Sequence, residues 1–208
     1  MALPDDLADK LLNEPIEEMS HEFEVDLTCL VIANHKITME GIAHAEDEEL
    51  ANLQESLKDE TDREMVWSIV SYQRNFYDDL RVAARNLAVV VLVTRLQRWA
   101  GAYARRIDPK REAGQPIDKE LNFLNGKLGP PPNDATQFFF DLAEVRHSVI
   151  HADSQPQWSF KGKTRSVDQR YVPNGYRVEV DDEGLRDAIA KAIAQIKWYD
   201  EKFAALHK

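Results

Sequence analysis

The stretch Arg146-His147-Ser148-Val149-Ile150-His151 holds the residue types of this chain that are best suited to chemistry on phosphate. Arginine is permanently charged, and its planar fork of donors matches phosphate oxygens. Histidine gains or loses a proton near neutral pH. Arg146 and His151 together supply an anion clamp and an acid–base group, the minimum needed to cut the phosphodiester of RNA without a metal.

The same residues allow two other interpretations. His147 and His151 are four positions apart, a spacing that can hold a metal from one helix face, with Asp153 or Glu144 as a third ligand. A purely structural interpretation pairs Arg146 with Glu144 or with a carbonyl at the C-terminal end of the helix, and lets the histidines cap that end, where the helix dipole favours positive side chains. We favour the phosphodiester chemistry, and we expect no metal and no cofactor.

A predicted helix positions these residues. It starts after Asn133-Asp134 and ends near Ala152, before a turn-like segment. Its apolar side chains recur at spacings of four, three and four: Phe138, Leu142, Val145 and Val149.

The helical repeat separates the candidate groups. At about 100° per residue, His147 and His151 lie about 40° apart, whereas Arg146 lies about 140° from His151. One continuous helix therefore does not aim Arg146 and His151 at one phosphate. Either the helix unwinds before His151, or a partner chain supplies the arginine.

A very long helical segment precedes this helix. Thr61 and Glu64 resemble a helix-capping pair, and no glycine or proline intervenes before Gly101. We predict one long helix or two end-to-end helices to Arg106, with the apolar run 87–93 at the centre of the core. The arginines along it are either exposed flanks or the lining of a phosphate-binding groove: Arg81, Arg85, Arg95, Arg98, Arg105 and Arg106.

The remaining segments predict smaller elements. A connector with a short helix over 118–124 joins the long helices. Residues 169–180, with Asn174-Gly175 as the turn, predict a small β-hairpin. The last helix spans about 181–206, with a regular apolar face: Leu185, Ile189, Ile193, Ile196, Tyr199 and Phe203.

The segment 158–165, directly after the histidines, mixes aromatic and basic side chains. These residue types contact single-stranded RNA by stacking and charge, although they also occur in ordinary basic loops. Its basic side chains are the candidate substrate-binding residues: Lys161, Lys163 and Arg165.

Charge divides the chain of 208 residues. Residues 1–64 hold 19 acidic and four basic residues, a net of −15, whereas the remainder holds 18 and 22, a net of +4, giving −11 overall. We expect two regions: an acidic helical N-terminal extension over 1–60, with a solvated acidic face, and a helical domain over 61–208. The single cysteine, Cys29, excludes an intrachain disulfide, and its apolar neighbours predict that it is buried. No secretory signal or membrane-length apolar run is visible, so we expect a cytoplasmic protein.

The motif and its surroundings resemble the HEPN superfamily over about residues 61–206. In that superfamily a long, penultimate helix ends in arginine, four to six residues and histidine, often with a polar residue after the arginine. Here Arg146, the polar His147 and His151 match that pattern with four intervening residues. Residues 1–60 carry no such resemblance. The fold that it implies is mainly α, a HEPN-like helical bundle, to which we add the small hairpin before the C-terminal helix.

The resemblance implies a metal-independent endoribonuclease that leaves a 2′,3′-cyclic phosphate. It further implies a homodimer in which Arg146 and His151 of two copies face each other, with His147 assisting. Such proteins often act as toxins or antiphage effectors, which allows an antitoxin partner. The alternatives are a catalytically silent module that binds a protein or nucleic acid, and a metal-dependent enzyme.

Overall fold

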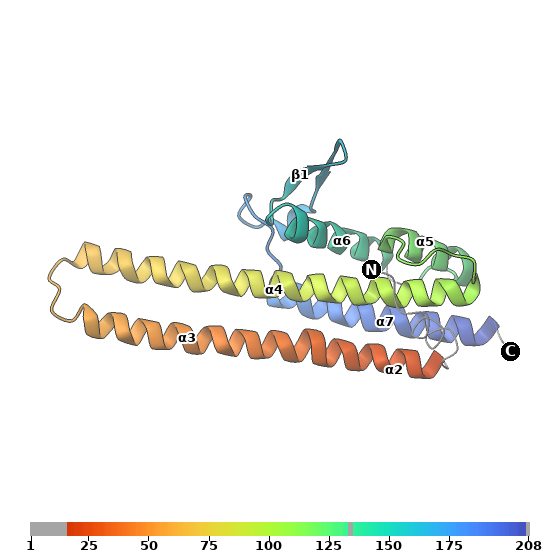
Figure 1. Cartoon of the computed structure of the whole chain (residues 1–208), viewed down its shortest axis with the longest axis horizontal. Coiled ribbons are helices and arrows are strands. Elements are labelled where there is room, and N and C mark those ends of the chain that lie inside the picture. The colour runs from red at the N-terminus through yellow and green to blue at the C-terminus, as the bar shows by residue number, and fades with distance from the viewer. Residues whose placement is uncertain (1–15, 133–134, 207–208) are drawn as a thin grey trace.

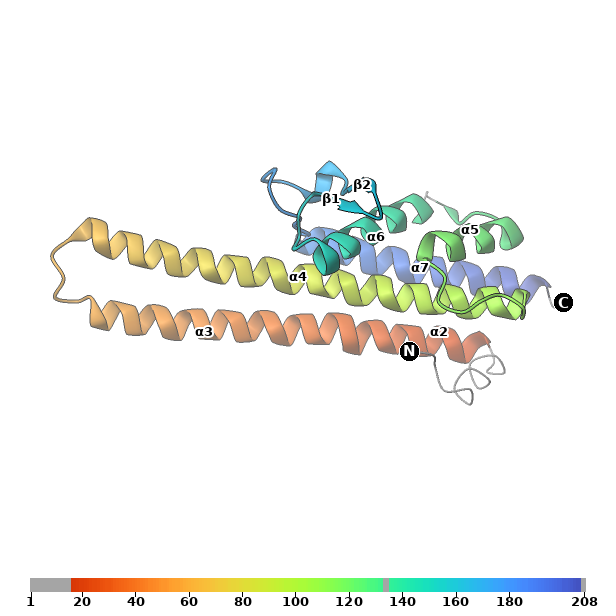
Figure 2. The same cartoon turned by 45° about the horizontal axis from the view of Figure 1, so that its top comes forward.

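The computed structural model describes residues 16–132 and 135–206, which fold mainly into α-helices, as expected. The elements, in chain order, are α2 (Ile16–Asp26), η1 (Leu27–Ala33), α3 (Asn34–Ser56), α4 (Arg63–Ile107), α5 (Ile117–Leu128), α6 (Ala135–His151), β1 (Gln157–Phe160), β2 (Lys163–Ser166), η3 (Gln169–Tyr171) and α7 (Asp182–Leu206). Elements α2, η1 and α3 form one rod along α4, and α5, α6 and α7 pack on the C-terminal half of α4 (Figure 1). The end of α3 and the start of α4 therefore project as a two-helix arm (Figures 1 and 2).

Helix α4 is a single helix of 45 residues, one of the two forms that the sequence allowed. Its first turn is capped by Asp62, whose Oδ1 accepts from the backbone N of Glu64 and Met65 at 3.0 and 3.1 Å. The prediction of Thr61 as the cap was wrong by one residue. Aspartate caps as well as threonine does, because its carboxylate accepts from the same unpaired N–H groups.

The N-terminal rod shares the core of the domain. Phe23, Leu27 and Val31, four positions apart, are buried against α4, and Phe23 meets Trp99 edge to face at 5.5 Å. Cys29 is exposed, so the prediction that it is buried was wrong. Because Leu27 and Val31 turn inward, the residue midway between them faces outward.

The core lies where α4, α5, α6 and α7 meet. The predicted apolar face of α7 is confirmed, with five residues buried and Ile193 partly buried. The run 87–93 lies in the core as predicted, with Val89, Leu92 and Val93 fully buried, although Leu87 at its start is 60% exposed.

The small antiparallel hairpin before the last helix is β1–β2, with Gln157 opposite Ser166 and Phe160 opposite Lys163. Its turn is Lys161-Gly162, whose φ angles of 48° and 73° suit a tight two-residue hairpin. A small hairpin before the last helix was predicted correctly, but its predicted position, 169–180, was wrong, since the hairpin spans 157–166.

Hydrogen bonds to other elements explain why 169–180 is not a hairpin. The buried side chain of Asn86 in α4 donates to the carbonyl of Val178 at 2.8 Å and accepts from the N of Val180 at 3.1 Å. The N of Val178 donates to the carbonyl of Ser154 at 2.7 Å. Val178 and Val180 thus pair with α4 and with the turn after α6. Between the two halves of the segment, the N of Glu179 donates to the carbonyl of Tyr171 at 2.8 Å, but no strand ladder forms.

We expect Asn86→Leu to lower the free energy of unfolding by about 2–5 kcal/mol. The leucine fills the space but leaves the Val178 carbonyl and the Val180 N–H buried without a partner. Urea denaturation followed by circular dichroism measures the loss. The exposed Asn75→Leu on the same helix is the matched control and should change stability little. Equal midpoints for the two variants would contradict this account.

Candidate functional site

Helix α6 stays regular to His151, so the helix does not unwind before that residue. His147 and His151 lie on one side of the helix, as the helical repeat predicted. Their rings stack with centroids 5.8 Å apart and planes 29° apart. His147 is half-buried and His151 is exposed, so the pair presents one covered and one open imidazole.

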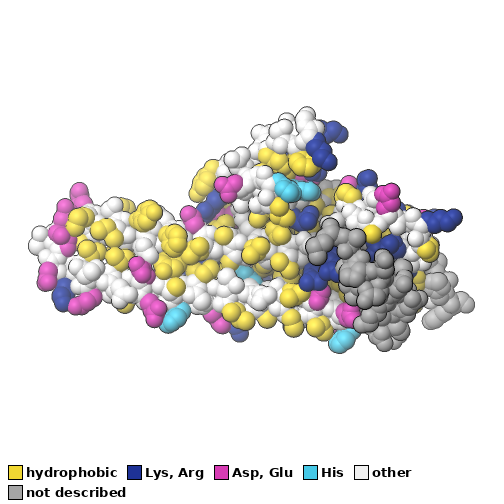
Figure 3. All heavy atoms as spheres, in the orientation of Figure 1, with side chains coloured by type: hydrophobic (Ala, Val, Ile, Leu, Met, Phe, Trp, Pro, Cys, Tyr) yellow, Lys and Arg dark blue, Asp and Glu magenta, His cyan; other side chains and the backbone are white. Residues whose placement is uncertain are grey.

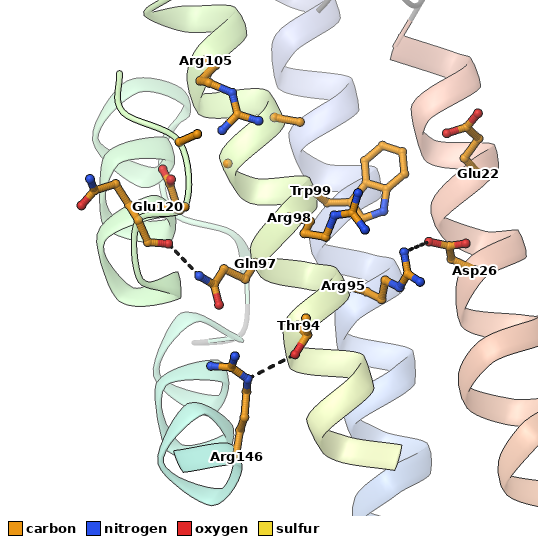
Figure 4. Close-up of a pocket in the computed structure, with 15 residues that line it drawn as sticks. Glu22, Asp26, Thr94, Arg95, Gln97, Arg98, Trp99, Arg105, Glu120 and Arg146 are labelled. Carbon is orange, nitrogen blue, oxygen red and sulfur yellow. Dashed lines mark hydrogen bonds and ion pairs between the residues drawn. The ribbon is translucent and has the colours of Figure 1, made fainter. Parts of the chain in front are cut away.

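Arg146 faces another part of the molecule. Its Nε donates to Thr94 Oγ1 of α4 at 3.2 Å, and it lines a pocket beside α4 (Figure 4). Burial lowers the pKa of Arg146, which nevertheless remains far above neutral pH. Of the two partners that the structural interpretation offered Arg146, Glu144 was wrong, because Glu144 accepts from Arg165 at 2.7 Å instead.

The β-hairpin lies beside the histidines through Phe160. The ring centroid of Phe160 lies 6.4 Å from that of His147 and 6.2 Å from that of His151. Two of the three predicted substrate-binding cations lie over the same ring, with Lys161 Nζ at 5.3 Å and Arg165 Cζ at 5.9 Å. The structure therefore brings two histidines, an aromatic ring and two cations together at the end of α6.

The third predicted cation, Lys163, lies opposite Phe160 in the hairpin, but its side chain is exposed, and no ion pair or ring contact joins that side chain to the cluster within the described part of the chain. Sequence reasoning missed Phe160 and Thr94 as individual contacts. The alternation of Trp158 and Phe160 before the Lys161-Gly162 turn is a strand signal that could have identified Phe160. No local signal identifies Thr94, since its role depends on how α6 packs on α4.

The environment of His147 favours its neutral form. Burial lowers the pKa of His147 below its ordinary 6.5, and the positive charges of Arg165, Arg146 and His151 lower that pKa further. A neutral imidazole can accept a proton at neutral pH, which is what a general base must do.

We expect the pKa of His147 to rise in Arg165→Gln, because this change removes the largest of the lowering charges. Two-dimensional NMR of the imidazole protons during a pH titration measures this pKa. Lys163→Gln is the matched control, since it removes a cation from the same hairpin away from the cluster. A His147 pKa at 6.5 or above in the unaltered protein would contradict the burial argument.

A metal site would need further ligands near the histidine pair. Within residues 16–132 and 135–206, no three side chains of the metal-binding types His, Cys, Asp and Glu come together. Glu144 is held by Arg165, and Asp153 is exposed in the turn after α6. The metal interpretation thus finds no third ligand among the described residues.

None of the described helices is both long and apolar enough to cross a membrane. Comparison with protein-family models, with curated proteins and with solved structures finds no match to this chain.

Proposed function

We propose that this chain is a metal-independent endoribonuclease of HEPN type that acts as a homodimer. The observation that carries the proposal is the stacked pair His147 and His151 at an open helix end, next to a basic aromatic hairpin. This arrangement places acid–base groups where a stacked base and a phosphate could both bind. Arg146 of a second copy would complete each site.

The chemistry needs no group beyond these side chains. A histidine removes the proton of the ribose 2′-hydroxyl, and the 2′-oxygen attacks the phosphorus. The 5′-oxygen leaves with a proton from a second acid, giving a 2′,3′-cyclic phosphate and a 5′-hydroxyl. Arg146 of the partner copy neutralises the charge that builds up on the phosphate oxygens. The neutral form of His147 suits the base, and the exposed position of His151 suits contact with the phosphate.

An exposed apolar stripe on α4 supports the homodimer. Its members lie on one helix face at spacings of seven, four, four and seven: Met65 (41% exposed), Tyr72 (75%), Phe76 (48%), Leu80 (37%) and Leu87 (60%). Yellow atoms are frequent along the arm and near its base (Figure 3). A contiguous apolar surface of this kind marks an interaction site.

One end of the apolar stripe on α4 lies near the helix that carries Arg146 and His151. Thr94, seven residues after Leu87 and on the same face of α4, accepts from Arg146 of the motif at 3.2 Å. Ile150, beside His151, is also exposed, at 46%. A second copy that covers the stripe would therefore lie close to the histidines, where a composite site needs it.

The biological role that we propose, a toxin or antiphage effector, rests on the family resemblance alone. Its controlled activity would call for an antitoxin, which could bind the same surfaces. Growth arrest on induction, abolished by His151→Ala, is the expected cellular result.

Labelled single-stranded RNA incubated with the protein, with and without EDTA, tests the proposed activity. We expect EDTA-resistant cutting that is lost in His151→Ala and Arg146→Ala, with 2′,3′-cyclic phosphate ends on the products. No cutting of varied RNAs by well-folded protein would refute the proposal. Cutting that EDTA abolishes would favour the metal-dependent alternative.

The second candidate function is a module that binds RNA or a protein without cutting. The orientation of Arg146 away from the histidines of its own chain favours it, because one copy then lacks an anion clamp. RNA binding that persists in the absence of any cleavage, and that weakens in Arg165→Gln, would support this candidate.

A further inference from the structure

A pocket of about 450 Å³ lies beside α4, where the arginine of α6 meets it (Figure 4). Its floor is one face of α4, at spacings of four, three and four: Thr94, Arg98, Gly101 and Arg105. Residues of α2 form one wall, and residues 113–115 with Arg146 form the other. The pocket thus lies on a different side of α6 from the stacked histidines.

The charges of the pocket do not balance within the described residues. Arg95 pairs with Asp26 at 3.1 Å, and Glu120 pairs with Arg111 at 2.9 Å. Among the ion pairs of the described residues, none joins a carboxylate to the other three arginines of the lining: Arg98, Arg105 and Arg146. The one remaining acid in the lining, Glu22, is exposed. Three guanidinium groups around one cavity need anionic ligands or water to satisfy their donors.

Other arginines of α4 show that this imbalance is local. Arg81 pairs with Glu46 and Asp78, and Arg85 donates to the carbonyl of Val180 at 2.9 Å. These arginines hold α4 to its neighbours. Arg98 and Arg105 make no such bond in the described chain, although they occur on the same helix.

A glycine at the pocket floor lets charged groups approach the helix. A Cβ at Gly101 would meet Glu120 Oε1 at 3.3 Å and Arg105 Nη1 at 3.5 Å. Glycine inside a helix costs about 1 kcal/mol relative to alanine, so its place here has a structural reason. The missing side chain allows the Glu120 carboxylate and the Arg105 guanidinium to sit directly against α4.

We propose that this pocket binds a small ligand with two or three linked phosphates, of the size of a nucleoside di- or triphosphate. Arg98 and Arg105, which the proposed RNA cleavage does not use, suit a chain of phosphates, because each guanidinium can bind phosphate oxygens through two parallel hydrogen bonds. Trp99, Ala102 and Ala113 give the rest of the lining an apolar surface that suits a flat base. The volume lies within the range of small-molecule sites. This site is additional to the proposed RNA cleavage and does not depend on it.

Isothermal titration calorimetry of the His151→Ala protein tests the pocket without any RNA cleavage. We expect ATP to bind and adenosine to bind far more weakly, since adenosine lacks the phosphates. Linked phosphates occur both in nucleotides and in inorganic polyphosphate, and tripolyphosphate distinguishes the two. If tripolyphosphate binds more weakly than ATP, the ligand is a nucleotide. If it binds equally well, the ligand is inorganic polyphosphate. A short RNA with a 5′-hydroxyl should not compete with ATP.

Variants connect the binding to the pocket. Arg98→Gln and Arg105→Gln should each weaken ATP binding about tenfold or more, as expected for the loss of a charge-assisted hydrogen bond. Arg186→Gln, an exposed arginine on α7 outside the pocket, is the matched control and should bind as before. Circular dichroism checks that each variant is folded. Absence of ATP and tripolyphosphate binding, or binding that neither pocket variant weakens, would overturn the proposal, whatever the result of the RNA assay.

Discussion

Mixing the Arg146→Ala and His151→Ala proteins should restore RNA cleavage that neither variant shows alone. Each variant by itself should lose about a hundredfold to ten-thousandfold in rate, because one removes the anion clamp and the other an acid–base group. In a mixed dimer, however, one of the two sites combines the intact Arg146 of one chain with the intact His151 of the other. With random pairing, about a quarter of the activity of the unaltered dimer should return.

The geometry of α6 is the reason for this expectation. The helix is continuous through both residues, with the histidines stacked on one side and Arg146 bonded to Thr94 on another. An arginine held in that direction cannot reach a phosphate at the histidines of its own chain. A two-fold axis can bring it to the histidines of a second chain.

The experiment requires exchange of subunits, which co-expression with two different tags provides. The control is co-expression of two differently tagged Arg146→Ala chains, which contains no intact pair and should stay inactive. Recovery in the mixture that does not exceed this control, with dimer formation verified, would exclude a site shared between chains. The anion clamp would then have to come from the same chain, and Arg165 beside Phe160 would be the next candidate.

The 3.6-residue repeat of the α-helix made it possible to predict that His147 and His151 lie on one side of α6. Residues four apart share a face at any point of an α-helix, so the positions of His147 and His151 followed from spacing alone. The burial of α7 followed from its apolar spacing in the same way. These predictions concern neighbours along one element, for which the backbone fixes the distances.

The spacing of residues along the sequence could not predict which distant segments form hydrogen bonds or ion pairs with each other. Asn174-Gly175 is the stronger hairpin signal, yet the hairpin forms at Lys161-Gly162, whereas Asn86 and Ser154 take hydrogen bonds of Val178 and Val180. Likewise, nothing local separates Arg85 from Arg98. The difference is that Glu179 and Asp182, far along the chain, come to lie against the first and no described carboxylate against the second.

A single charge on the apolar stripe should convert the dimer into monomers and abolish cleavage at low protein concentration. Phe76→Glu places a carboxylate in the centre of the surface that we expect a second copy to cover. An unpaired charge buried at such an interface costs about 3–5 kcal/mol, so the dissociation constant should rise at least about a hundredfold. Phe76 is 48% exposed in the single chain, and the substitution should therefore alter the fold of each monomer little.

Analytical ultracentrifugation over a range of concentrations measures the effect, and the RNA assay at the same concentrations links assembly to activity. Arg74→Glu introduces the same carboxylate on the same helix, about 200° around from Tyr72 and so away from the stripe, and should leave the dimer intact. A Phe76→Glu protein that remains a dimer would remove the stripe from the interface. Full cleavage by a monomeric Phe76→Glu protein would also exclude the site shared between chains, since a site that needs Arg146 of a second chain cannot work in one chain.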